Sequence, residues 1–406
     1  MVGAGAAGLA TAIFTRRAGA AQTVAVLDSA RKPGAKILVS GGSRCNVTNV
    51  HVGEADFRGG PPRIVRHILR AFPADEAVAF FAGLGVPLHV EENGKLFPDS
   101  NRSRDVLDAL LCELNATGAT LLAGHQVTDV IPDRGSFRLE TARGPIGAGR
   151  VVLATGGRSL PKTGSDGAGL EIARRLGHTI VPTTPALTPL LLADDDLLHR
   201  QLSGVSQPVE LSIWIEGAIA ERLFGSMLWT HFGVSGPVAL DASRHFLRAG
   251  LEHRPVAITV NFCEGAPFDE IDRRWTELAG ERPRSTAAAA LASIVPGSVA
   301  DALLAYLAID RGTALAHFGR DDRRRLVHTL TAFPLPVTGA RGYNHAEVTA
   351  GGVALTEIDP ATMESRVRQG LYLVGEMLDA DGRIGGFNFQ WAWATGYIAG
   401  TALARH

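Results

Sequence analysis

The chain has 406 residues, of which 46% are hydrophobic and 20% charged, and its formal net charge is -1. This is the composition of an ordinary globular protein with two or three domains, and no basic excess indicates a nucleic-acid partner. Three cysteines without a CxxC pair exclude a disulfide framework and a cysteine-rich zinc site, and are typical of a reducing cytoplasm. No run of about 18 apolar residues predicts a membrane span.

The first thirty residues predict a βαβ unit that holds a dinucleotide. Gly3, Gly5 and Gly8 have the GxGxxG spacing, and Asp28 ends an apolar run twenty residues later. In such a unit the first glycine permits a tight turn, the second lets the backbone approach a pyrophosphate, and the third lets the helix pack on the sheet. Asp28 is placed to accept hydrogen bonds from the adenosine ribose, so NAD or FAD is expected before NADP.

The first strand of this unit is short. Such a strand normally supplies about five or six residues before the first glycine, whereas only Met1 and Val2 precede Gly3. One interpretation is a start placed too far downstream or a truncated chain, and this is the one preferred. The alternative is a protein whose affinity for the cofactor is weakened.

The remaining sequence predicts an α/β fold whose nucleotide-binding domain is interrupted by an insertion. Residues 31–60 are expected to form a glycine-rich loop region, 62–118 to be mainly helical, and 120–153 to contain short strands. Alternating segments after residue 190 predict antiparallel strands, and helical patterns follow them. The expected organisation is a Rossmann-like domain at 1–189 and 336–406, an inserted β-barrel domain at 190–266 and an inserted helical domain at 267–335.

A glycine-rich cluster, Ser40 to Asn49, follows the second strand of the nucleotide-binding unit. Gly41 and Gly42 allow a close backbone approach to a ligand. Arg44 is expected to neutralise phosphate, and Asn46 to hydrogen-bond a planar heterocycle. A loop in this place can run along a pyrophosphate toward a redox-active ring.

A second cluster lies near the C-terminus and favours FAD over NAD. The strand that ends in Gly375-Glu376 can present a carboxylate to a ribityl hydroxyl. Gly385 and Gly386 open an apolar helix, whose N–H groups can face the pyrimidine end of an isoalloxazine and stabilise negative charge on the reduced ring. The alternative, an ordinary strand and buried helix, explains the apolar residues but not the glycine pair.

Three stretches, 40–49, 154–157 and 346–400, resemble the BaiN/YhiN-type family of FAD-dependent flavoproteins, which includes aminoacetone oxidase-like proteins. The family patterns are close to SGGGRCN-x-TN, ATGG and VT-x-GGV…TMES…GE-x-LD…GG-x-N-x-Q, and residues 362–365 and 230–237 match as well. The chain departs from the family at Ser43, where a third glycine is usual, at Ile384, where threonine is usual, and at Phe387 and Phe389. The resemblance implies a split FAD domain with a β-barrel and helical insertion.

The cofactor-binding residues that these motifs and the resemblance predict can be given together. They are Gly3, Gly5, Ala6, Ala7, Gly8, Asp28, Lys36, Ser40, Gly41, Gly42, Arg44, Asn46, Val127, Ala154, Thr155, Gly156, Gly157, Gly375, Glu376, Asp379, Gly385, Gly386, Phe387, Asn388 and Gln390. No histidine, cysteine and carboxylate spacing predicts a metal site.

Three residues are candidates for catalysis. Cys45 could relay electrons beside a flavin, although a small buried thiol that packs the loop is the favoured alternative because no resolving cysteine lies nearby. His231 and His345 could each serve as a general acid, although a lone histidine is more often structural.

These features predict a cytoplasmic FAD-dependent oxidoreductase that reduces a small organic substrate by hydride transfer through flavin N5. No second GxGxxG occurs, so NADH or NADPH would act as a transient donor. Some relatives are named as reductases of unsaturated bile-acid-type ketones. A flavin-dependent RNA-modification protein and a non-catalytic nucleotide-binding protein are the alternatives. Neither a nucleic-acid nor a membrane partner is expected, and the substrate and oligomeric state stay open.

Overall fold

The computed structural model describes residues 1–193 and 198–405, which form two compact units. The first unit combines Met1–Pro185 with Ala346–His406, and the second, Ala186–His345, is inserted between these two parts. The second unit thus interrupts the first in the sequence, and it ends at His345, ten residues beyond the predicted end of the insertion at residue 335. Within the described residues, no helix has both the length and the apolar character needed to cross a membrane.

A parallel sheet forms the centre of the first unit. Its strands, in spatial order, are β20 (Leu371–Leu373), β10 (Val151–Leu153), the single residue Val2, β1 (Ala25–Asp28) and β6 (Thr120–Ala123). Val2 forms parallel bridges to both Leu27 and Leu153. Its amide donates to the carbonyl of Val152 at 2.8 Å, and the amide of Leu27 donates to the carbonyl of Met1 at 2.9 Å. The two residues before Gly3 thus occupy the central position in the sheet.

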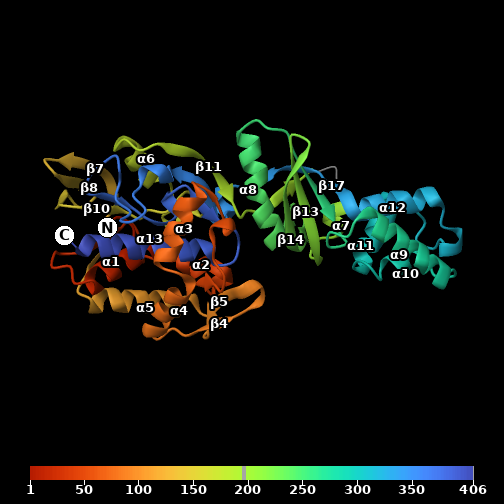
Figure 1. The fold of residues 1–406 in the computed structure, drawn as a ribbon, viewed down its shortest axis with the longest axis horizontal. Coiled ribbons are helices and arrows are strands. Elements are labelled where there is room, and N and C mark those ends of the chain that lie inside the picture. Colours follow the sequence, from red (N-terminus) through yellow and green to blue (C-terminus); the bar gives the residue numbers. More distant parts are fainter. Residues whose placement is uncertain (194–197, 406) are drawn as a thin grey trace. The chain divides into compact units, whose positions relative to one another are not determined.

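Two buried helices, α1 (Ala6–Arg17) and α13 (Phe387–Ala404), pack side by side through small residues (Figure 1). A Cβ atom added to Gly396 would lie 2.9 Å from that of Ala10, and one added to Gly400 would lie 2.7 Å from that of Phe14. Both contacts pair positions 386 apart in number, so the helices run parallel. By the same offset, residue 392 of α13 is level with Ala6, the first residue of α1. Because α13 begins at Phe387, five residues before residue 392, its N-terminus projects about 7.5 Å beyond that of α1.

The other elements of the first unit surround this centre. The helices are α2 (Ala35–Ser43), α3 (Pro62–Ala71), α4 (Ala74–Gly83), α5 (Ser103–Ala116) and α6 (Ala168–Arg175). The strands are β2 (Thr48–Asn49), β3 (Phe57–Gly59), β4 (Leu88–Val90), β5 (Lys95–Pro98), β7 (Val127–Asp133), β8 (Ser136–Thr141), β9 (Ile146–Ala148), β11 (Ile180–Ala186), β19 (Val348–Val353) and β21 (Ala380–Gly382).

The expected helices between residues 62 and 118 are confirmed, but the prediction of a loop region at 31–60 is wrong in part. This segment contains α2 and the short strands β2 and β3. The helical residues of α2 run for only about one turn before Gly41 and Gly42 leave the helical conformation, so the periodic signal is too short to recognise.

A seven-stranded antiparallel sheet is built from strands at the beginning and at the end of the second unit. The spatial order is β17 (Phe333–Leu335), β16 (Val256–Asn261), β13 (Ser206–Ile215), β14 (Ala218–Thr230), β15 (Gly233–Ser235), β12 (Leu190–Leu192) and β18 (Val337–Ala340), and α8 (Pro237–Leu251) packs on it. The two edge strands, β17 and β18, are separated in the chain by Pro336 alone. The end of β17 and the start of β18 therefore lie close together, which requires the sheet to curl. Closure of the sheet into a β-barrel stays a prediction.

The helices expected after residue 267 are present in the second unit. They are α9 (Phe268–Glu281), α10 (Ala287–Leu291), α11 (Gly297–Tyr306) and α12 (Arg320–Ala332), and a short helix, α7 (Leu198–Gln201), precedes the sheet (Figure 1). Trp275 is buried among them, with its ring centroid 5.3 Å from that of Phe318.

Candidate functional site

Three glycines at the start of α1 have two different structural roles. Gly3 has φ +102°, and a Cβ atom there would lie 2.4 Å from the carbonyl oxygen of Ala154. A Cβ atom on Gly8 would lie 1.9 Å from the carbonyl oxygen of Gly3. No protein atom lies within 4 Å of the Cβ position of Gly5. Gly3 and Gly8 therefore serve packing, whereas Gly5 faces open space that a ligand can enter.

Backbone N–H groups and one carboxylate converge beside this open space. The first hydrogen bond of α1 joins the amide of Leu9 to the carbonyl of Gly5 at 3.0 Å, so the amides of residues 5–8 precede the helical ladder and face the N-terminal end. Asp28 accepts from the amides of Ala4 at 2.7 Å and Ala30 at 2.8 Å, one on each oxygen. These bonds fix the carboxylate and leave acceptor capacity for hydroxyl groups.

Val127 and the Ala154–Gly157 segment lie around the same end of the sheet. Val127 is the buried first residue of β7, and the chain just before it is held to Asp28, whose carbonyl accepts from the amide of His125 at 2.8 Å. The amide of Ala154 donates to the carbonyl of Val2 at 2.9 Å, and Gly156 has φ +71°. Residues far apart in the sequence are thus gathered at the carboxyl end of the parallel strands, where such folds bind ligands.

The loop after α2 adopts an unusual backbone conformation. Gly41, Gly42, Ser43 and Cys45 have φ values of +53°, +66°, +67° and +63°. Glycine adopts this left-handed region at no steric cost, so Ser43 and Cys45 carry backbone strain. No protein atom lies within 4 Å of the Cβ position of Gly42, which therefore also faces open space.

Two predictions for this loop need correction. Arg44 donates to a carboxylate oxygen of Glu91 at 2.6 Å, and its guanidinium carbon lies 4.1 Å from the ring centroid of Phe97. Its charge is already paired, so the arginine anchors the loop instead of facing a phosphate. Asn46, in the amide orientation that satisfies its hydrogen bonds, donates to the carbonyl of Thr48 at 2.9 Å and accepts from the amide of Gly386 at 3.0 Å. It fixes the start of α13 and is not free for a heterocycle.

Glu376 is the centre of a hydrogen-bond network that joins four segments. It lies in the short 3-10 helix η7 (Gly375–Met377), directly after β20. Lys36 of α2 donates to one carboxylate oxygen at 2.5 Å and to the hydroxyl of Ser159 at 2.6 Å. Ser159 donates to the other carboxylate oxygen at 2.6 Å, and the amide of Thr349 in β19 donates to that same oxygen at 3.1 Å.

This network brings together motifs that the sequence analysis treated separately. A Cβ atom on Gly157 would lie 2.4 Å from the hydroxyl oxygen of Thr349, so only glycine permits this approach. Ser159 and Thr349 are members of this network that sequence reasoning missed. The only available signal was that each follows or overlaps a recognised motif, ATGG in one case and VT-x-GGV in the other.

The start of α13 is held by its own side chains and by β2. Gly386 has φ +93°, and a Cβ atom there would lie 2.4 Å from the carbonyl oxygen of Thr48. The side-chain amide of Asn388 both accepts from the backbone amide of Gly382 and donates to its carbonyl, each at 2.8 Å. Gln390 accepts from the Thr48 hydroxyl and donates to the carbonyl of Phe72, also each at 2.7 Å.

These contacts correct the expected roles of two side chains. The side-chain amides of Asn388 and Gln390 are engaged with protein atoms, so they shape the glycine turn from inside and do not project toward a ligand. Phe387 is fully buried, with its ring perpendicular to that of Phe57. Asp379 contributes backbone contacts here, since its carbonyl accepts from the amide of Gly60 at 2.7 Å.

Cys45 is not the redox-active thiol that was considered. Its side chain is fully buried, and burial raises the pKa of the thiol to about 12. The thiol therefore stays protonated at neutral pH, whereas reactive cysteines are partly exposed thiolates. His231 and His345 both lie at solvent-exposed positions of the second unit, and their part in catalysis stays a prediction.

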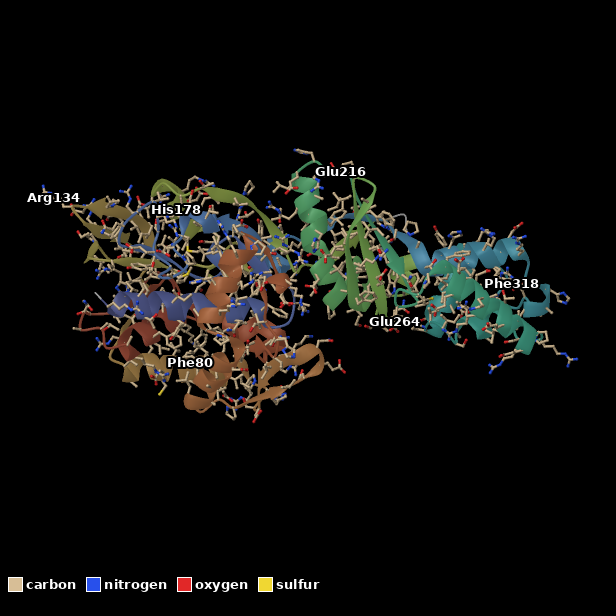
Figure 2. The ribbon with its side chains drawn as sticks, in the orientation of Figure 1. Phe80, Arg134, His178, Glu216, Glu264 and Phe318 are labelled. Carbon is tan, nitrogen blue, oxygen red and sulfur yellow. The ribbon has the colours of Figure 1, made fainter. Side chains whose placement is uncertain are left out.

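A buried Ser-His-Glu arrangement occurs elsewhere in the first unit and was not predicted. Ser365 Oγ lies 2.8 Å from His178 Nε2, and His178 Nδ1 lies 2.9 Å from a carboxylate oxygen of Glu357 (Figure 2 labels His178). Ser365 Oγ also accepts from the amides of Val367 and Arg368, so its own hydroxyl donates to His178 Nε2. The histidine proton is then on Nδ1, which donates to Glu357.

The same arrangement is structural and not nucleophilic. Ser365 is 6% exposed, so a substrate carbonyl has no access to its oxygen. Burial lowers the pKa of His178, against the opposing effect of Glu357, and keeps the ring neutral. The hydrogen bonds of His178 connect the chain just before β11 to the segment that follows β19, which contains Glu357 and Ser365.

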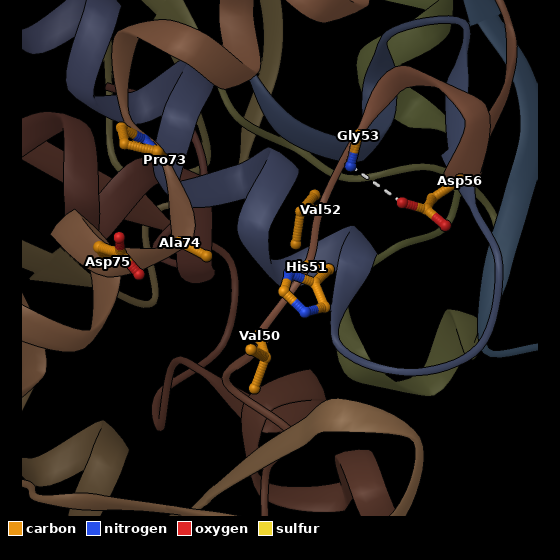
Figure 3. A pocket seen from close by; sticks show the side chains of 8 residues that line it. All are labelled: Val50, His51, Val52, Gly53, Asp56, Pro73, Ala74 and Asp75. Atoms are coloured by element: carbon orange, nitrogen blue, oxygen red, sulfur yellow. Dashed lines mark hydrogen bonds between the residues drawn. The ribbon is translucent and has the colours of Figure 1, made fainter.

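A shallow cavity of about 400 Å³ opens beside the loop that follows β2 (Figure 3). Its lining residues are Val50, His51, Val52, Gly53, Asp56, Pro73, Ala74 and Asp75. Asp56 accepts from the amide of Gly53 at 2.9 Å and forms a salt bridge with Arg383, whereas the exposed His51 ring projects from one wall. The cavity lies one residue beyond Asn49, whose side chain donates to the carbonyl of Gly385 at 3.0 Å.

The residues present fit an FAD molecule. The open positions at Gly5 and Gly42 give a backbone-lined path, and the free amides of α1 suit a pyrophosphate. The N-terminus of α13, about 7.5 Å further along, offers a second positive helix end for the redox-active ring. Glu376 lies in the segment between these two helices, where a ribityl chain would pass.

Comparison with known proteins identifies the family. The family model described as HI0933-like protein Rossmann domain matches residues 1–402. A protein of Clostridium scindens named 3-dehydro-bile acid delta(4,6)-reductase is 31% identical over 404 residues, which cover 100% of this chain and 98% of that protein. A protein of Escherichia coli K12 named ribosomal RNA dihydrouridine synthase is also 31% identical over 404 residues, with 99% and 97% covered.

Solved structures support the fold. The 3-ketosteroid delta1-dehydrogenase of Sterolibacterium denitrificans aligns with a TM-score of 0.51 at 13% identity, covering 100% of this chain and 98% of that one. The quinol fumarate reductase subunit FrdA of E. coli aligns with a TM-score of 0.50 at 16% identity, covering 100% and 69%. The chain belongs to the HI0933-like Rossmann-domain family and is an FAD-dependent oxidoreductase.

Proposed function

We propose that this member of the HI0933-like family uses NADH or NADPH to reduce a carbon–carbon double bond that is conjugated to a carbonyl group. The observation that carries the proposal is a bond change shared by relatives with unlike substrates. The names of two relatives, a bile acid delta(4,6)-reductase and a dihydrouridine synthase, both describe the saturation of such a bond, in a steroid dienone and in a uracil ring. These relatives match this chain with equal identity over nearly its whole length.

The chain's own residues would bind and orient the cofactor for this chemistry. Bound FAD supplies hydride transfer between the nicotinamide donor and the double bond. The amides of residues 5–8 and the positive end of α1 would hold the pyrophosphate, and Asp28 would hold the ribose. Lys36 and Ser159 fix the orientation of Glu376, which would bind the ribityl hydroxyls. The N-terminus of α13 would stabilise negative charge at the pyrimidine end of the ring.

The reaction also requires one proton. The donor loses a hydride and becomes NAD⁺ or NADP⁺, one alkene carbon gains that hydride, and the neighbouring carbon gains a proton from an acid. His231 and His345 remain the candidates for this acid in the second unit, and the exposed His51 is an additional candidate in the first unit.

A small unsaturated ketone is the first candidate substrate. The C. scindens relative supports it, and so does the near-neutral net charge of this chain, which indicates no strong preference for polyanions. A uridine within RNA is the second candidate, because two relatives of this length, from E. coli and Haemophilus influenzae, are named ribosomal RNA dihydrouridine synthases.

An anaerobic reoxidation experiment tests the proposal. Protein loaded with FAD is reduced with NADPH or NADH and then mixed with a 3-oxo-delta(4,6) bile acid or with deproteinised ribosomal RNA. The proposal expects flavin reoxidation by one substrate, with two hydrogen atoms gained by the product in mass spectrometry. Reoxidation by oxygen alone, with neither substrate reduced, would contradict it.

A further inference from the structure

Helix α3 presents a basic face to solvent. Its buried residues are Val65, Ile68 and Leu69, and the helix packs against α13. Its exposed charged or titratable residues are Arg63, Arg66, His67 and Arg70, and it contains no acidic residue. The amphipathic pattern explains why the helix forms, but it does not explain why the solvent-exposed face carries arginines.

Glu54 is the acidic residue that faces this side of α3, where it interacts electrostatically with both Arg66 and Arg70. Arg66 forms a salt bridge with Glu54 at 2.6 Å. In the part of the chain that the structure describes, neither Arg63 nor Arg70 forms a salt bridge with a carboxylate. Arg63, His67 and Arg70 follow the spacing i, i+4, i+7, which places them along one side of the helix over about 10 Å.

The N-terminal end of α3 lies beside the segment that leads into α13, whose N-terminus is assigned to the redox-active ring. Strand β3, which precedes the helix, pairs with β21, and Gly59 is the partner of Ala380. The amide of Gly60 donates to the carbonyl of Asp379 at 2.7 Å. Arg63 follows this contact by three residues, so a ligand that lies along α3 passes close to the segment leading into α13.

A cavity adjoins the same helix. The 400 Å³ cavity is lined by residues 50–53 and 56, which precede α3 in the chain, and by residues 73–75, which follow it (Figure 3). This volume falls in the range of small-ligand sites, and the cavity is open to solvent. Two exposed arginines without a salt bridge, Arg63 and Arg70, thus lie on a helix whose flanking segments line a recess.

We propose that the basic face of α3 binds the sugar-phosphate backbone of an RNA strand and so places a base near the N-terminus of α13, where the redox-active ring is expected. The inference rests on the second candidate substrate, uridine in RNA. Solvent-facing arginines spaced along a convex helix fit the repeated charges of a polymer backbone, whereas a small anion requires converging groups. The net charge of -1 does not exclude this, because phosphate contacts depend on the local arrangement of arginines.

Charge reversal on this face provides the test. The double variant R63E/R70E is compared with the wild-type protein, loaded with FAD, in binding a fluorescein-labelled oligouridylate of about 20 nucleotides. The matched control is R102E/R104E, which makes the same charge change at side chains 68% and 54% exposed near the start of α5. Fluorescence anisotropy gives the Kd over a series of salt concentrations, and circular dichroism checks the fold of each variant.

The expected result separates local contacts from a general charge effect. R63E/R70E should raise the Kd at least about tenfold at about 0.1 M salt and reduce the slope of log K against log salt by about 1.4, which corresponds to two single-strand phosphate contacts. The variant R63K/R70K should retain most of the binding. R102E/R104E should change the Kd by less than about threefold, because its charges lie elsewhere on the unit.

The outcomes also distinguish this inference from the proposed function. Equal weakening by R63E/R70E and R102E/R104E, or no RNA binding by the wild-type protein at about 0.1 M salt, overturns the role of α3. In that case reduction of the bile acid would still support the proposed reductase. If neither substrate is reduced but only R63E/R70E loses RNA binding, the reductase fails and the binding surface stands.

Discussion

Gly5 and Gly8 lie three residues apart in the GxGxxG motif, yet a methyl group added to each should have different effects. A Cβ atom on Gly8 would lie 1.9 Å from the carbonyl oxygen of Gly3, so G8A forces α1 away from the turn. A Cβ atom on Gly5 meets no protein atom within 4 Å. The backbone of Gly5, with φ -85° and ψ -169°, is also accessible to alanine.

The magnitudes follow from these contacts. Overpacking of this kind costs about 1–3 kcal/mol, and a loss of about 2 kcal/mol corresponds to a Tm lower by roughly 4–8 °C for a unit of this size. G5A should change the stability of the FAD-free protein by less than about 0.5 kcal/mol. Loss of hydrogen bonds to a charged pyrophosphate should instead weaken FAD binding by about 1.5–3 kcal/mol, or roughly 10- to 150-fold in Kd.

Thermal unfolding with and without FAD measures both effects. At an FAD concentration about 100 times the wild-type Kd, the wild-type protein should gain about 2.7 kcal/mol, and a variant that binds about 100-fold more weakly should gain about 0.4 kcal/mol. G5A should therefore match the wild-type Tm without FAD and fall below it with FAD, while G8A falls below it in both cases. Wild-type FAD affinity in G5A, or an unchanged Tm in G8A without FAD, would refute the reasoning.

Three other changes test separate parts of the account. Lowering the pH from about 8 to about 5 should destabilise the protein, because burial lowers the pKa of His178 in the folded state. The contribution of His178 to stability is complete above the pKa of an unfolded histidine, about 6.5, and decreases as the pH falls below that value. In pH-dependent unfolding, H178Q should lose less stability over this range than the wild-type protein. C45A should leave the rate of flavin reduction by NADPH within about twofold in stopped-flow absorbance, and thiol reagents should label the exposed Cys112 well before Cys45. K36M should weaken FAD binding about tenfold or more in a fluorescence titration, because Glu376 loses the donor that orients it, and K36R should recover part of the affinity.

The nucleotide-binding part of the fold could be predicted because its signals are local. The glycine spacing and the glycine pair before α13 mark positions where a side chain is disfavoured, and the apolar run before Asp28 marks a buried strand. In the structure Gly3, Gly385 and Gly386 have positive φ values, Gly8 approaches the carbonyl of Gly3 closely, and Gly5 faces open space. Val2 occupies the central place in the sheet, which is the place that the motif implies for the residue before Gly3.

The roles of individual polar side chains could not be predicted in the same way. Arg44, Asn46, Asn388 and Gln390 occupy recognised motifs, but their partners are backbone carbonyls, backbone amides, a hydroxyl or a carboxylate contributed by other elements. The network of Lys36 with Ser159 and Glu376 spans 123 and 340 residues of sequence. Such contacts depend on how the chain folds back, so residue type alone does not show whether a polar group faces a ligand or the protein.

The absorbance spectrum of the purified protein with added FAD tests the central claim most directly. The account predicts a protein-bound flavin band near ~450 nm that bleaches under anaerobic conditions when NADPH or NADH is added. Retention of no flavin after gel filtration, even from a solution with excess FAD, would contradict the assignment of this chain as an FAD-dependent oxidoreductase.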